Sequence, residues 1–187
     1  ILEFVERLAQ EVGLINIHPY AAATKGMKGQ EMTEVGLLSA SGAVGFTDGT
    51  KAIADPVVMR RLLSYATMFG KPVIQHPEEP TLAREGCATE GETATRLGLP
   101  GIPACAEVMM VERDLQLVRL TGGRYHAAHV STGAAIEAIR KAKAEGLNVT
   151  CDTAPQYFAL NELAIVDYRT FARMSPPLRS EADRQAV

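Results

Sequence analysis

The chain has 187 residues, of which 47% are hydrophobic and 22% are charged, and its formal net charge is −3. This balance is typical of a globular protein with enough chain to bury a core, which excludes a disordered protein. No apolar run reaches the roughly 20 residues that a transmembrane helix needs. A membrane is therefore not an expected partner. Since no basic stripe is present to bind phosphates, a nucleic acid is not expected either. We expect a small-molecule substrate.

Short apolar segments alternate with segments of helix length, and this alternation predicts parallel β-α-β units. In chain order the predicted elements are helix 2–11, strand 14–18, helix 31–41, strand 43–48, helix 56–69, strand 72–76, helix 104–120, strand 125–130, helix 132–145 and strand 147–152. Pro56 suits the first turn of its helix and Gly70 the end of it. The segment 77–103 is too long for an ordinary βα loop of about 2 to 6 residues. The tail from Ala154 is predicted to be irregular.

The predicted fold class is α/β, as part of a (β/α)8 TIM-type barrel. Such a barrel has eight units and typically about 250 residues, so five predicted strands fit a barrel without its ends. The chain also opens at Ile1 without a methionine and stops at Val187 within helix-like sequence. We therefore expect residues 1–187 to be part of a single barrel domain in a longer polypeptide. An open doubly wound sheet is the alternative, which composition alone does not exclude.

Three predicted strands end in a side chain that can bind a metal ion. Asp48, His76 and His129 each follow an apolar run directly. Because the C-terminal ends of parallel strands converge on one rim, where barrel active sites are built, these side chains are predicted to lie close together. Two imidazoles and a carboxylate form a ligand set suited to zinc or manganese. The alternative for each residue alone is a structural hydrogen bond at the strand end, but the three equivalent positions favour a site and a barrel.

Other polar residues near strand ends receive a more ordinary interpretation. Strand alternation would place His126 and His129 on opposite faces, so we expect His126 to face the helices. His18 either lines the pocket or has a structural role. Asp152 is expected to cap the turn that follows its strand.

The long segment 77–103 carries four carboxylates, Glu78, Glu79, Glu90 and Glu92. We interpret them as solvated loop charge or as indirect support for the site. The segment itself is expected to pack beside the catalytic rim, with Glu90 or Glu92 near the mouth.

The three cysteines, Cys87, Cys105 and Cys151, are odd in number and widely spaced, and no secretory signal accompanies them. This pattern indicates reduced thiols and a cytoplasmic location. None of the cysteines forms a CxxC zinc motif.

Short motifs are spread over almost the whole chain. They are Gly45-Phe46-Thr47-Asp48-Gly49, His76-Pro77-Glu78-Glu79, Glu90-Gly91-Glu92, 97–103, Ala106-Glu107, Glu112-Arg113-Asp114, 126–132 and 176–180. In this order and spacing they resemble the dihydroorotases, of the kind related to hydantoinases and allantoinases within the amidohydrolase superfamily. The resemblance implies reversible hydrolysis of the cyclic amide of dihydroorotate to N-carbamoyl-L-aspartate, in pyrimidine biosynthesis.

The resemblance also implies a cofactor and partners. The cofactor would be Zn²⁺, with two ions in the complete protein, although other divalent metals are possible. Asp48 would bridge the two ions in place of the carboxylated lysine of relatives, and His76 and His129 would be metal ligands. A homo-oligomer is implied, and aspartate carbamoyltransferase is a possible partner.

Parts of the family pattern are absent from this sequence. The chain has no His-x-His pair, no neighbouring substrate-binding arginine, no second-strand asparagine and no eighth-strand aspartate, so its five strands would be the third to the seventh. No catalytic residue is therefore assigned, because the proton-transferring aspartate is expected beyond residue 187. Gln156 stands where the family usually has a histidine. Ser175 stands where it has an asparagine that holds the substrate, which makes Ser175 the candidate substrate-binding residue.

Two alternatives to a dihydroorotase remain open. One is a non-catalytic homologue that serves as a scaffold for aspartate carbamoyltransferase, which Gln156 and Ser175 favour. The other is a hydantoinase or allantoinase, against which an aspartate at position 48 in place of lysine argues. The three retained ligand positions favour the enzyme over the scaffold.

Overall fold

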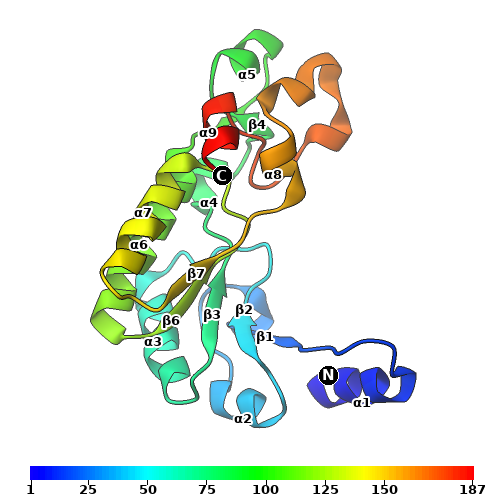
Figure 1. The fold of residues 1–187 in the computed structure, drawn as a ribbon, viewed down its shortest axis with the longest axis vertical. Coiled ribbons are helices and arrows are strands. Elements are labelled where there is room, and N and C mark those ends of the chain that lie inside the picture. Colours follow the sequence, from blue (N-terminus) through cyan, green and yellow to red (C-terminus); the bar gives the residue numbers. More distant parts are fainter.

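A parallel five-stranded sheet forms the centre of the molecule (Figure 1). The structure is a computed structural model and describes all residues, 1–187. The sheet order is β1-β2-β3-β6-β7, so each strand pairs with the next sheet strand along the chain. The strands are β1 (Tyr20–Ala22), β2 (Gly45–Thr47), β3 (Pro72–Gln75), β6 (Arg124–Ala127) and β7 (Val149–Cys151).

Three helices cover one face of this sheet: α3 (Pro56–Thr67), α6 (Cys105–Thr121) and α7 (Gly133–Ala144) (Figure 1). The main hydrophobic core lies between them and the strands. It takes Val73 and Tyr125 from β3 and β6, while their neighbours Ile74 and His126 point to the opposite face by strand alternation. A doubly wound sheet has helices on both faces and a reversal in strand order. The one-sided cover and the sequential order are therefore those of a barrel segment.

The first predicted strand was misplaced. Residues 14–18 form no strand, and Leu14 and Ile15 are exposed. The chain joins the sheet only at β1, whose register pairs Tyr20 with Gly45. An apolar run predicts a strand only if a neighbouring strand accepts its hydrogen bonds, and β2 is paired with residues 20–22 instead.

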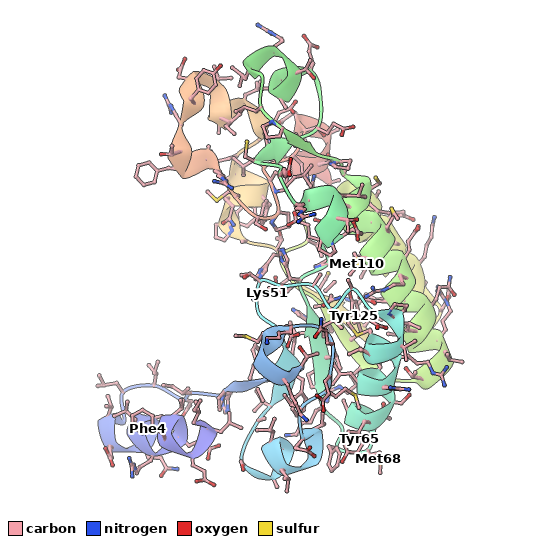
Figure 2. All side chains as sticks on the ribbon, turned by 180° about the vertical axis from the view of Figure 1, so that it is seen from behind. Phe4, Lys51, Tyr65, Met68, Met110 and Tyr125 are labelled. Carbon is pink, nitrogen blue, oxygen red and sulfur yellow. The ribbon has the colours of Figure 1, made fainter.

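The amphipathic helix α1 (Leu2–Val12) precedes this strand and stands apart from the main body. Figure 2 shows Phe4 on this projecting helix, whereas Tyr125 lies deep within the body. Only Leu2 of α1 is buried. None of the helices is both long and apolar enough to cross a membrane.

A smaller unit lies beyond the C-terminal ends of the strands (Figure 1). It is built from the segment 77–103 and the tail, which share a second hydrophobic cluster that includes Ala94 and Leu178. The segment contributes α4 (Pro80–Ala83), β4 (Ala88–Thr89), α5 (Glu92–Leu97) and β5 (Gly101–Ile102), with β4 and β5 paired in parallel.

The prediction of an irregular tail was wrong in part. It contains the helices α8 (Pro155–Ala159) and α9 (Glu181–Ala186) and the short 3-10 helices η2 (Glu162–Tyr168) and η3 (Thr170–Ala172). The helix α9 packs on α7, where a Cβ atom on Gly133 would lie 2.8 Å from the Ala186 side chain. The absence of a side chain at Gly133 therefore permits this contact. Two further short helices, η1 (Lys25–Met27) and α2 (Val35–Ala40), follow β1.

The helix α3 begins as its sequence predicts. Asp55 is the N-cap residue, and its carboxylate accepts hydrogen bonds from the backbone N–H groups of Val57 and Val58. Pro56 occupies the first turn, where its missing N–H group costs nothing.

The helix α6 carries a fully buried carboxylate, Asp114, which faces the core. It accepts hydrogen bonds from the Tyr125 hydroxyl (3.1 Å) and from Gln75 (3.3 Å), and Arg113 pairs with its other oxygen. Burial raises the pKa of Asp114 to about 6, although the Arg113 guanidinium opposes this shift. The folded protein therefore holds this proton more tightly than the unfolded chain does.

Replacing Asp114 by Asn should remove a pH dependence of stability. Because the folded pKa is raised, the contribution of Asp114 is fully present below the unfolded pKa and is lost as the pH rises toward about 6. A shift of about two pKa units corresponds to about 3 kcal/mol. Urea unfolding of both proteins at a series of pH values from about 4 to 7 measures this contribution. The free energy of unfolding of the wild type should fall relative to Asp114→Asn; a constant difference would contradict the assignment.

Candidate metal centre

The three predicted ligand positions all lie at C-terminal strand ends. Thr47 pairs with Ile74, and Ile74 with His126, so Asp48, His76 and His129 follow the last paired residues of three adjacent strands. The rings of His76 and His129 lie side by side, with their centroids 6.0 Å apart. Asp48 is buried, and both its oxygens accept hydrogen bonds from Thr24, through the backbone N–H and the hydroxyl.

No three His, Cys, Asp or Glu side chains of this chain are arranged to hold a metal ion by themselves. The donor at His76 nevertheless fits a metal. Its side chain is buried, and its Nδ1 atom has no hydrogen-bond partner. A buried ring nitrogen without a partner is costly unless something binds it. Together with the neighbouring ring of His129, it offers two nitrogen donors of the kind that zinc prefers.

Glu78 and Ser175 lie on the other side of the His76 ring. The Ser175 hydroxyl donates to Glu78 Oε2 (3.0 Å) and lies 3.4 Å from His76 Nε2, which is itself 3.6 Å from Glu78 Oε2. Burial raises the pKa of Glu78, but the neighbouring His76 ring, the hydrogen bond from Ser175 and the charge of Arg179 together outweigh it and leave the pKa lowered. Glu78 is therefore a buried carboxylate beside the site, which agrees with the second of our two interpretations, indirect support, and not with solvated loop charge. Glu79, by contrast, caps α4.

The prediction that His126 faces the helices was wrong. Its Nδ1 lies 2.8 Å from the Thr150 hydroxyl and its Nε2 3.0 Å from Asp152 Oδ2, on the face opposite the helices. The strand β6 ends at Ala127, and His129 has a left-handed backbone with φ of 59°. Alternation therefore does not extend to His129. The side chains of both histidines approach the same carboxylate.

We expected that carboxylate, Asp152, to cap the turn that follows its strand, but it does not. Its Oδ1 atom accepts the backbone N–H of His129 at 2.6 Å and lies 3.4 Å from His129 Nδ1. Burial raises the pKa of Asp152, but the hydrogen bonds from His126 and His129 outweigh it, and the pKa is lowered. Asp152 thus remains an acceptor that orients the His126 ring and holds the His129 backbone. Asp152 directly follows a strand, as Asp48 does, so the pattern that identified Asp48 in the sequence could also have identified Asp152.

A cavity of about 690 Å³ opens beside His76 and Glu78. The loops after β1, β2 and β3 line it, and Pro80 and Ala83 bring α4 to its wall. The segment 77–103 therefore lies beside His76, as predicted. Neither Glu90 nor Glu92 lines this cavity, and Glu90 lies against Gly101 instead, so the expectation that one of them lies at the mouth is not met for this cavity.

His18 and the cysteines take no part in this arrangement. His18 is exposed and precedes β1, so it does not end a strand. All three cysteines are free thiols.

A family model described as Dihydro-orotase-like matches residues 1–135. The chain belongs to the dihydroorotase-like family. It is 46% identical over 187 residues to the dihydroorotase of Desulforapulum autotrophicum, covering 100% of this chain and 44% of that protein. It is 47% identical over 171 residues to the dihydroorotase of Desulfotalea psychrophila, covering 91% of this chain and 41% of that protein. The chain thus spans less than half the length of these curated relatives of the dihydroorotase-like family.

Solved structures of hydantoinases have the same fold. The L-hydantoinase of Arthrobacter aurescens superposes with a TM-score of 0.75 at 20% identity, over 99% of this chain and 43% of that one. A D-hydantoinase superposes with a TM-score of 0.62 at 24% identity, over 81% of this chain and 35% of that one. At these identities the likeness establishes the fold. The dihydroorotase-like chain is a partial TIM-type barrel, as predicted.

Proposed function

We propose that this chain is the central part of a dihydroorotase, which converts dihydroorotate and water reversibly into N-carbamoyl-L-aspartate. The observation that carries the proposal is the pair of rings from His76 and His129, 6.0 Å apart at adjacent strand ends. The identity of 46% to a curated dihydroorotase over the whole chain supports it. The aspartate at position 48 favours this activity over that of a hydantoinase or allantoinase.

In this proposal each residue of the site has a defined task. His76 and His129 would hold the metal through ring nitrogens, and Asp48 would supply a carboxylate whose oxygens keep lone pairs that Thr24 does not use. When bound, a divalent metal lowers the pKa of its water ligand and polarises a carbonyl oxygen. Ser175 lies beside His76, where its hydroxyl can contact a substrate. The proton-transferring aspartate and the remaining ligands would come from outside residues 1–187.

Zinc is the metal that we propose, because nitrogen and carboxylate donors at a strand-end rim suit it. A cytoplasmic location with reduced cysteines also belongs to the proposal, as does self-association into an oligomer. Contact with aspartate carbamoyltransferase belongs to the scaffold alternative as well as to the enzyme, so it does not separate the two.

Metal removal tests the proposed activity. Treatment of the complete protein that contains this chain with a chelator should abolish cyclisation of N-carbamoyl-L-aspartate, and added Zn²⁺ should restore it. The assay follows formation of dihydroorotate, with hydantoin and allantoin as control substrates. A protein that binds zinc but acts only on the controls would identify a hydantoinase or allantoinase. A protein without activity that still binds aspartate carbamoyltransferase would identify the scaffold.

A further inference from the structure

The turn that follows β6 is held by two carboxylates from other elements. Four consecutive backbone N–H groups, from His129 to Thr132, all have acceptors. Asp152 supplies the first two acceptors, through its carboxylate and its backbone carbonyl. Glu107 of α6 supplies the last two. The left-handed conformation of His129, which a residue with a side chain rarely adopts, is therefore fixed from both sides.

Glu107 is fully buried, and it uses its carboxylate almost entirely on this turn. Its Oε1 atom accepts the backbone N–H of Thr132 at 2.9 Å and the Thr132 hydroxyl at 2.7 Å. Both oxygens lie 3.1 Å from the backbone nitrogen of Ser131, whose hydroxyl donates to Oε2. A carboxylate is the side chain that can accept all these donors, because it carries no hydrogen of its own when ionised.

The same network reaches the tail through Arg179, which is also buried. Its Nη2 atom lies 3.9 Å from Glu107 Oε2, and its Nε donates to the Ser131 hydroxyl at 3.0 Å. Its Nη1 atom lies 3.3 Å from the carbonyl oxygen of Ile102 in β5. Glu107 and Arg179 thus join α6, the turn after β6, the small sheet and the segment that carries Ser175.

We propose that Glu107 is a positioning residue for His129. Glu107 touches neither His129 nor any other candidate ligand; it acts through the backbone of Ser131 and Thr132, which fixes the direction in which the His129 ring leaves the turn. This inference rests on the proposed function, because it assumes that His129 binds metal. Without Glu107 the turn would relax toward more common backbone angles, and the ring would no longer stay beside His76.

The test is Glu107→Gln in the complete protein. The amide keeps the size of the side chain but offers one acceptor oxygen and turns two N–H donors toward a turn that is itself made of donors. Loss of a group that orients a metal ligand typically costs about 10- to 100-fold in metal affinity. We expect a loss of that size in Zn²⁺ affinity, measured by competition with a chromophoric chelator. The visible spectrum of the Co²⁺-substituted protein should change as well, because it reports ligand geometry.

Asp114→Asn is the matched control, because Asp114 is equally buried on the same helix but contacts Tyr125 and Gln75. It should leave both the Zn²⁺ affinity and the Co²⁺ spectrum unchanged. Equal losses in both variants would reduce Glu107 to a general stabiliser of α6 and overturn the inference.

Ser131→Ala decides the matter if Glu107→Gln does not fold. It removes the hydroxyl that donates to Glu107 and accepts from Arg179, and it leaves the backbone bonds, so we expect a smaller loss of Zn²⁺ affinity in the same direction. Unchanged Zn²⁺ affinity in Ser131→Ala, or wild-type Zn²⁺ affinity in folded Glu107→Gln, would overturn this inference and leave the proposed function intact. A wild-type protein that binds no zinc would overturn the proposed function with it.

Discussion

The isolated 187-residue chain should cyclise N-carbamoyl-L-aspartate at least about 10²- to 10⁴-fold more slowly than the complete protein, the range that a missing acid-base partner typically accounts for. In the proposed function the proton acceptor and further metal ligands would come from outside residues 1–187. Within the chain, His76 and His129 are joined by no third side chain that completes a metal-binding group. Weak metal binding should therefore lower the rate of cyclisation further, beyond the effect of the missing proton acceptor.

The comparison requires both proteins to be purified and assayed at the same zinc concentration. The isolated chain also leaves β1 and β7 as open edges of the sheet, which favour pairing with other chains, so its association state should be measured alongside. Near-equal turnover by the two proteins would mean that the catalytic groups lie among residues to which we assign no role.

Replacing His76 by Ala in the complete protein should weaken zinc binding by more than about 100-fold, beyond the range observed when only a supporting group is lost. The substitution removes a buried nitrogen donor that has no other partner in the protein. It also leaves Glu78 and Ser175 without the ring that they face. Activity should fall with metal content, measured by metal analysis of the purified protein and by the rate of dihydroorotate formation.

His18→Ala is the control for this substitution, because His18 is exposed and lies before β1, away from the strand ends. It should retain the metal content and the activity of the wild type. If His76→Ala keeps its zinc while His18→Ala loses it, the ligand set must be built on the N-terminal side of the sheet.

The sequence predicted four of the five sheet strands to within three residues at each end and misplaced the first. β3 begins at Pro72, as predicted, and α3 begins at Pro56 because a proline and an acidic N-cap specify that start locally. The strand predicted at 14–18 was wrong, because strand pairing depends on a partner that is far away in the sequence.

Some residues of the candidate site could likewise be proposed from the sequence, and others could not. A polar residue directly after an apolar run marks the C-terminal rim of a parallel sheet, so Asp48 and His76 could be proposed from the sequence alone. His126 could not be placed, because the rule of alternation fails where the strand ends at Ala127 and the backbone turns left-handed at His129. Asp152 shared the strand-end signal, but only its contacts with His126 and His129 distinguish it from a cap.

The sequence by itself determined the family, the parallel β-α order and the residue types at the strand ends, because these depend on local patterns and on motifs of fixed spacing. Only the tertiary structure decided which buried carboxylates support the site. Glu107 lies 24 residues from Ser131, and Arg179 lies 48 residues from it, so their contacts form only when α6, the turn after β6 and the tail pack together. A buried carboxylate must find its donors wherever the fold places them, and no local sequence pattern specifies that place.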